Sequence, residues 1–131
     1  MAFAFRNNKR KNIIRHERGS KAGGTLYLCA KLKSPVTIEE ADYAVRGDMM
    51  SLWVRFNKNM IADKEVYLFE MRSGYIPTHR AEFPIFNWDN KAEVIGTAVA
   101  YRNGEVRLYF KAVPTSALAF YMSYVIESAD R

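Results

Sequence analysis

The stretch that most restricts the fold is VIGTAVAYRNGEVRLYFKAV, which runs from Val94 to Val113. The dipeptide Asn103-Gly104 at its centre is the strongest short-range signal for a β-hairpin, because both central positions of the tight turn need φ > 0. Apolar and polar residues alternate on each side of this dipeptide, as they do in a strand. The chain is therefore predicted to contain an antiparallel hairpin here.

A two-residue turn also predicts which residues face each other across the hairpin. Arg102 then faces Glu105, and the alternating positions beyond this pair divide into two faces. One face is apolar, and on the other aromatic and cationic side chains stand over small ones. The apolar face holds Ile95, Thr97, Val99 and Tyr101 with Val106, Leu108, Phe110 and Ala112, and the other face holds Gly96, Ala98 and Ala100 with Arg107, Tyr109 and Lys111.

Further short segments have the period-2 pattern of strands. Residues 25–33 and 51–57 alternate clearly, and 65–72 is apolar on both sides, as a central strand is. The aromatic and β-branched content of 116–127 favours a strand, although Thr115-Ser116 could cap a helix. Two prolines, Pro77 and Pro84, predict that 75–86 forms an irregular edge strand.

One short helix is expected as well. Thr37 and Glu40 have the spacing of a capping box, and Gly47 is placed to end a helix that begins after Thr37. Six or seven short strands, one helix and no alternation of strands with helices predict an all-β, mostly antiparallel fold. A jelly-roll-like sandwich is our first choice and a small barrel of the OB type our second.

The charge of the chain is concentrated at its N-terminus. Residues 1–24 contain seven cations and the single acid Glu17, so they account for the whole net charge of +6, and residues 25–131 are neutral. A block of like charge with little apolar content is typical of an interaction tail. We therefore predict a basic extended arm over 1–24, which ends in a glycine hinge, followed by one β-sandwich domain over 25–131.

Aromatic and basic residues also alternate on the non-core sides of three predicted strands. Such surfaces occur as solvated sheet faces, as protein interfaces and as platforms for single-stranded nucleic acid. Because the body is neutral, nucleic-acid binding is the least favoured of these three interpretations for the strands. The basic arm, in contrast, is suited to bind phosphate backbones. The predicted nucleic-acid or partner-binding residues are Arg6, Lys9, Arg10, Lys11, Arg15, Arg18 and Lys21 in the arm, and Tyr27, Lys31, Trp53, Arg55, Arg107, Tyr109 and Lys111 in the body.

Catalytic and metal-binding patterns are weak in this sequence. His79 has Arg80 and Glu82 nearby, a set that could cleave RNA by acid–base chemistry, but an exposed histidine beside a loop explains it more simply. Cys29 is interpreted as a small packed apolar residue, and one Cys with two separated His does not form a metal site. We expect a protein that is not an enzyme and that needs no cofactor or metal.

These traits together predict a structural or assembly protein, most economically a virion (capsid or shell-associated) subunit. Its arm would contact DNA, RNA or neighbouring subunits, and its body would form a homo-oligomer or a shell with other structural proteins. One alternative is a single-stranded nucleic-acid-binding protein of OB-like type, and another is a small inhibitor or adaptor that binds an acidic partner protein. The lone Cys29 and the lack of a signal peptide or membrane span predict a virion or host-cytoplasm location.

Overall fold

The computed structural model of the chain describes residues 16–18, 26, 28–57, 61 and 63–127. This described part contains nine strands, all in antiparallel pairs, and no α-helix. The strands are β1 (His16–Arg18), β2 (Ala30–Leu32), β3 (Ile38–Arg46), β4 (Met49–Phe56), β5 (Glu65–Met71), β6 (Ala81–Asn87), β7 (Val94–Ala100), β8 (Glu105–Phe110) and β9 (Leu118–Val125).

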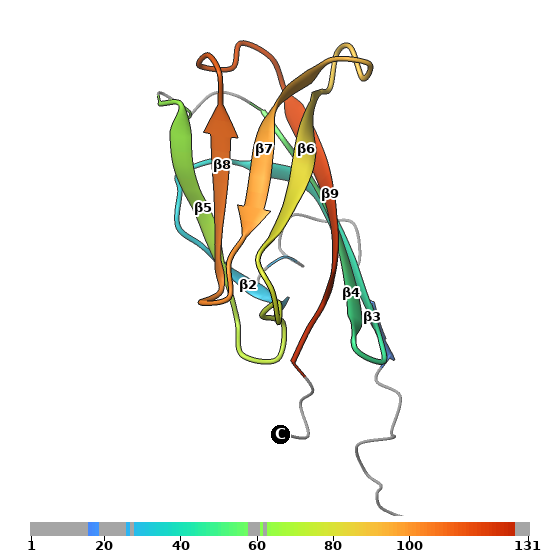
Figure 1. The fold of residues 1–131 in the computed structure, drawn as a ribbon. Helices are drawn as coiled ribbons and strands as arrows, with labels where there is room; N and C mark the ends of the chain where they lie inside the picture. The colour runs from blue at the N-terminus through green and yellow to red at the C-terminus, as the bar shows by residue number, and fades with distance from the viewer. Residues whose placement is uncertain (1–15, 19–25, 27, 58–60, 62, 128–131) are drawn as a thin grey trace, which may run out of the picture.

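The nine strands form one curled sheet in the order β1-β3-β4-β9-β6-β7-β8-β5-β2. Figure 1 shows β6 and β9 side by side near the top and separating toward the bottom, and their pairing covers only Ile85–Asn87 and Leu118–Phe120. The sheet thus folds into a half-barrel with two layers, β1-β3-β4-β9 and β6-β7-β8-β5-β2. The all-β antiparallel class is confirmed, whereas the choice between a jelly-roll sandwich and a small barrel stays a prediction.

One hydrophobic core lies between the two layers. Half of its largest fully buried side chains come from alternate positions of β4 and β9. The ring of Phe69 from β5 stacks against that of Phe120 from β9 with centroids 6.5 Å apart. The predicted strands over 51–57 and 116–127 are confirmed, with the apolar residues inward. The inward residues of these two strands are Met50, Leu52, Val54 and Phe56 in β4 and Leu118, Phe120, Met122 and Tyr124 in β9.

The predicted hairpin is present, but its register differs by one residue. The amide of Tyr101 donates to the carbonyl of Glu105 (2.8 Å) and that of Gly104 donates to Tyr101 (2.9 Å), so the loop has three residues. Gly104 has φ 96°, the left-handed conformation that completes such a loop. The observed partner of Leu108 is therefore Ala98, whereas the predicted partner was Val99.

Because of this shift, the predicted faces are right for β8 and wrong for β7. The inward side chains of β8 are as predicted, but those of β7 are reversed, because a slip of one residue exchanges the faces of a strand. Gly96, Ala98 and Ala100 lie on the inward side with Val106, Leu108 and Phe110, whereas Thr97, Val99 and Tyr101 share the outer side with Arg107 and Tyr109.

The predicted helix after Thr37 is wrong, because these residues form β3. Ala41, Tyr43 and Val45 are buried at alternate positions, which is a strand pattern, and β4 pairs with β3 over nearly its whole length. Gly47, with φ 62°, lies in the tight turn between Arg46 and Met49 and does not end a helix. Tertiary pairing here overrides the local capping signal.

The predicted edge strand is an interior one. β6 lies between β9 and β7, and Pro84 pairs with Thr97 of β7. Pro84 is tolerated because pairing with β9 begins only at Ile85, so the missing N–H is not needed on that side.

Three residues of the predicted arm, His16–Arg18, form edge strand β1, which pairs with Ala44–Arg46 of β3. The rest of the predicted arm and hinge lies outside the described residues. Within the predicted strand over 25–33, the described residues form a strand only from Ala30 to Leu32, at the opposite edge of the sheet, and Leu28 is exposed.

Candidate functional site

The predicted binding residues of the body separate into two groups on opposite outer faces. β4 and β8 direct their alternate side chains into the same core from opposite layers, so their outward side chains point away from each other. Arg18 lies in β1, and Lys31 in β2 and Lys111 just after β8 are exposed. The other predicted residues, Arg6, Lys9, Arg10, Lys11, Arg15, Lys21 and Tyr27, lie outside the described residues.

The outer side of β3, β4 and β9, called here the tryptophan face, holds Glu40, Trp53, Arg55, Trp88 and Lys91. The rings of Trp53 and Trp88 lie 5.8 Å apart, and the indole N–H of Trp53 donates to the carboxylate of Glu40 (2.8 Å). The guanidinium of Arg55 and the ammonium of Lys91 lie 5.0 and 4.1 Å from the Trp88 ring centroid. Both cations gain cation–π contacts with one indole.

The sequence indicates Trp53 and Arg55 but not their partners. Trp88 is positioned by the turn after β6, where the Asn87 side chain accepts from the amide of Asp89 (2.9 Å) and the amide of Trp88 donates to Ala117 (2.8 Å). A tryptophan within a run of turn-forming Asn and Asp residues is expected to be partly exposed. That pattern could have identified Trp88 from the sequence.

The outer side of β5, β7 and β8, called here the tyrosine face, is built around Arg107. Its guanidinium lies 4.5 Å from the ring centroid of Tyr67 and bonds the carboxylates of Glu105 (2.8 Å) and Glu65 (3.4 Å). The hydroxyls of Tyr101 and Tyr109 are hydrogen bonded at 2.5 Å. The sequence indicates Arg107 and Tyr109, whereas the other members follow from the observed register.

These contacts change the acid–base properties of the tyrosine face. The hydrogen bond to Tyr101 is the main cause that raises the pKa of Tyr109 to about 12, and burial adds to it. The hydrogen bond that Arg107 donates to the carboxylate of Glu105 is the main cause that raises the pKa of Arg107. Tyr67 has a pKa raised chiefly by burial. These groups keep their protonation states through neutral pH and serve recognition better than proton transfer.

Carboxylates accompany the cations of both faces. Arg55 lies 3.6 Å from Glu40 on the tryptophan face, in addition to the two acids at Arg107. Lys33 and Glu70 are 3.8 Å apart beside the tyrosine face. A cation already paired with a carboxylate is less available to neutralise a phosphate, so the observed pairing favours protein contacts over nucleic acid on these faces.

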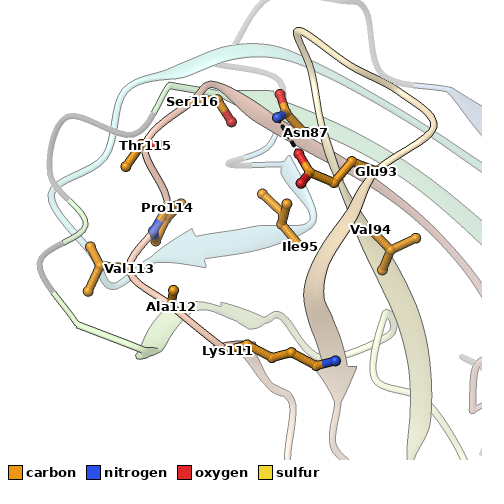
Figure 2. Close-up of a pocket in the computed structure, with 10 residues that line it drawn as sticks. All are labelled: Asn87, Glu93, Val94, Ile95, Lys111, Ala112, Val113, Pro114, Thr115 and Ser116. Atoms are coloured by element: carbon orange, nitrogen blue, oxygen red, sulfur yellow. Dashed lines mark hydrogen bonds between the residues drawn. The ribbon is translucent and has the colours of Figure 1, made fainter.

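Lys111 lines a separate hollow of about 280 Å³ at one end of the half-barrel (Figure 2). The hollow lies between the start of β7 and the connection from β8 to β9. Figure 2 shows Lys111 at one end and, at the other, the amide of Asn87 donating to the carboxylate of Glu93 (2.7 Å). Its remaining lining is largely apolar: Val94, Ile95, Ala112, Val113 and Pro114, with Thr115 and Ser116 at the margin.

The residues considered for catalysis, His79, Arg80 and Glu82, are exposed on the surface. His79 is exposed, with its Nδ1 3.1 Å from the hydroxyl of Thr78, and Arg80 and Glu82 form an exposed ion pair (2.9 Å). Cys29 is fully buried, as its packing role predicted. Within the described residues, no group of three or more His, Cys, Asp or Glu could hold a metal ion, and no helix is long and apolar enough to cross a membrane.

Comparison of the chain with protein-family models, with curated proteins and with solved structures found no match.

Proposed function

We propose that this chain is a non-enzymatic structural subunit, of the kind that builds virion shells, whose basic N-terminal segment binds nucleic acid while the β body contacts neighbouring subunits. The separation of charge carries this proposal. Residues 1–24 hold the whole net charge of +6, and residues 25–131 are neutral. Electrostatic binding to a polyanion is thereby assigned to one end of the chain.

The composition of the outer faces supports the role given to the body. Trp, Tyr and Arg dominate the energetics of protein interfaces, and both faces present them with carboxylates beside the cations. Faces with local charge balance can contact copies of themselves without strong repulsion. The OB-like alternative fits less well, because Trp53 and Tyr109 lie on opposite layers rather than along one nucleic-acid track.

Strand β1 limits how much of the arm can be deleted without removing part of the observed sheet. Because His16–Arg18 pair with β3, a deletion that stops at residue 15 leaves the observed sheet complete. Residues 1–15 still contain five cations and no acid. A deletion of 1–15 therefore removes most of the charge while keeping all nine observed strands.

The experiment compares three proteins: the full chain, the deletion of 1–15, and a full-length variant with Arg6, Lys9, Arg10, Lys11 and Arg15 changed to Gln. Binding to a fluorescent single-stranded DNA is titrated over a range of salt concentrations. If the five cations of residues 1–15 each neutralise one phosphate, they contribute about −3.5 to the slope of log binding constant against log salt concentration. We expect both altered proteins to lose this contribution. The glutamine variant separates the loss of charge from the loss of chain length.

Light scattering after size exclusion tests assembly in the same samples. We expect the full chain and the glutamine variant to form oligomers of equal mass, because the body supplies the lateral contacts. A monomeric full chain would refute the assembly role. A salt slope that is unchanged after removal of residues 1–15 would refute the role of the arm. Capture of an acidic protein by a monomer would favour the adaptor alternative.

A further inference from the structure

The hollow of about 280 Å³ at one end of the half-barrel owes its lining to an irregularity in β7 (Figure 2). The partners of Val94 and Gly96 are consecutive residues of β6, so Ile95 between them is a bulge. A bulge turns a side chain out of the regular alternation of its strand. Ile95 thus packs against the edge of the core and also lines the hollow.

Two exposed valines extend this apolar surface. Val94 is 57% and Val113 41% exposed, and they are two of the six large apolar side chains that are exposed in the described part of the chain. Figure 2 shows them on opposite sides of the hollow. Exposed apolar side chains around a concave surface are typical of a docking site. An engineered cavity of roughly 150 Å³ holds a benzene molecule, so this larger hollow can hold a phenyl ring.

The margins of the hollow carry opposite charges. The carboxylate of Glu93 accepts a hydrogen bond from Asn87 (2.7 Å) and can accept others, because it has two oxygens. Among the residues that the structure describes, neither Glu93 nor Lys111 forms an ion pair. The hollow therefore fits an extended segment in which an aromatic side chain is followed by a cation, with the cation toward Glu93 and the uncharged part toward Lys111.

The N-terminal segment MAFAFR of this chain has that pattern. Phe3 and Phe5 lie on the same side when such a segment is extended, and Arg6 follows directly. Residues 1–5 contain no charged side chain, and the five cations that precede β1 all lie within 6–15. Phenyl rings do not neutralise phosphates, and their apolar area is buried only by contact with another surface.

The arm joins the body at the end opposite to the hollow. His16 pairs with Arg46 beside the β3–β4 turn, and the last residues of β9 pair with Met49 at that same end. The first residue of β9, Leu118, lies two positions after Ser116 of the hollow. The eight residues of β9 therefore separate the arm from its own hollow by roughly 25 Å. A copy placed end to end brings a second hollow to the end where the arm begins.

We propose that residues 1–6 of one copy dock in the hollow of a neighbouring copy, with Phe5 in the hollow, Phe3 on the exposed valines and Arg6 toward Glu93. Residues 6–15 span about 33 Å when extended, which is enough to connect two copies. The two surfaces belong to different parts of the chain, so the contact is head-to-tail and propagates until a ring or shell closes. This inference rests on the proposed assembly role and identifies what holds one copy to the next.

The first test measures docking without assembly. A full-length serine variant, with Phe3→Ser and Phe5→Ser, keeps the hollow and every charge but lacks both rings. A fluorescent peptide of residues 1–11 is titrated against this variant, and its anisotropy is recorded at low and raised salt. We expect saturable binding that persists in raised salt, because the contact is mainly apolar. A peptide that carries the same two serines should not bind.

Further variants assign the binding to the hollow. Ala112 is exposed and lines the hollow, so Ala112→Phe fills it and should weaken peptide binding by more than about tenfold. Ala92→Phe is the matched control, because Ala92 is exposed in the turn before β7 and does not line the hollow. Each substitution is added to the serine variant, and thermal melts verify that the proteins remain folded.

The second test measures assembly by light scattering. The serine variant and a full chain with Ala112→Phe should both form smaller oligomers than the parent, whereas a full chain with Ala92→Phe should not. A mixture of the serine variant with Ala112→Phe should form pairs, since each supplies the surface that the other lacks. The serine variant should keep the salt slope of DNA binding, because its charges are unchanged.

Docking is refuted if the peptide does not bind the serine variant, or if it binds equally well after Ala112→Phe in a folded protein. A serine variant with the oligomer mass of the parent also refutes it and leaves the proposed assembly role standing. A monomeric full chain that binds the peptide only after both phenylalanines are replaced would place the segment in its own hollow. That result would refute docking between copies and the assembly role together.

Discussion

The tryptophan and tyrosine faces are built from similar types of residue, but their surfaces differ in shape. On the tryptophan face, Ala44 of β3 and Ser51 of β4 are direct partners and line a groove of about 400 Å³. On the tyrosine face, Val99 of β7 is 2% exposed, although it points away from the core. Its neighbours Arg107 and Glu82 flank it in register, and the long side chains of this face cover it.

The difference shows that composition alone does not define a recognition surface. Aromatic and charged residues give a filled, flat patch where a larger apolar residue supports them, and a groove where small residues are aligned across strands. The first suits a protein partner and the second a small ligand. Four changes, ordered from the largest expected effect to the smallest, test how far the two faces are independent.

Phe120→Ala should disrupt both faces at once, because both layers are supported by the same core. Phe120 is fully buried and stacks on Phe69 of the opposite layer. Truncation of a buried phenylalanine destabilises by about 3–5 kcal/mol. Chemical denaturation should show this loss, with tryptophan emission and the near-ultraviolet tyrosine signal changing in one transition. Two separate transitions would show that the faces unfold independently.

Gly104→Val should act mainly through the tyrosine face. Gly104 has φ 96°, and an added Cβ would lie 3.1 Å from the carbonyl oxygen of Met71. We expect a loss of roughly 1–3 kcal/mol, the range for a strained backbone position. The variant should also lose the signal of the Tyr101–Tyr109 pair while the tryptophan emission of the other face is unchanged. A thermal melt equal to that of the parent would exclude strain at this loop.

Tyr109→Phe tests the hydrogen bond that distinguishes the tyrosine face. Loss of the bond to Tyr101 should destabilise by about 1 kcal/mol at neutral pH. The pKa of Tyr109 is raised in the folded state from 10.0 to about 12, so its contribution is fully present below pH 10 and is lost as the pH rises through about 12.

Alkaline denaturation of parent and variant measures this contribution. The stability difference between them should be constant below pH 10 and should shrink between pH 10 and about 12, while the parent ionises one tyrosine that the variant lacks. A difference that does not change with pH would mean that the two hydroxyls are not coupled.

Thr37→Ala should have the smallest effect, at the margin of the tryptophan face. Thr37 is exposed and precedes β3, so its hydroxyl caps no helix. Surface substitutions of this kind change stability by less than about 0.5 kcal/mol. A loss of about 1 kcal/mol in a thermal melt is the value for a removed helix cap, and it would support the helix that the local sequence predicts.

Several features of this protein could be predicted from the sequence because they depend on neighbours along the chain. The alternation in 51–57 and 116–127 determines which side chains of β4 and β9 are buried. The dipeptide Asn103-Gly104 determines that a hairpin forms, and the outward positions of Trp53 and Arg107 follow from the same alternation. The concentration of charge in residues 1–24 is likewise a property of the sequence alone.

Other features were decided only by tertiary structure. The capping signal at Thr37 favours a helix locally, but strand pairing with β4 and burial of Ala41, Tyr43 and Val45 make the segment a strand. The third residue in the loop that ends at Gly104 reverses the faces of β7. Trp88 meets Trp53 because the sheet pairs β6 with β9 and β9 with β4. The pairing of β3 with β4 and the contact between Trp53 and Trp88 join residues far apart in the chain, so their free energy is absent from any local pattern.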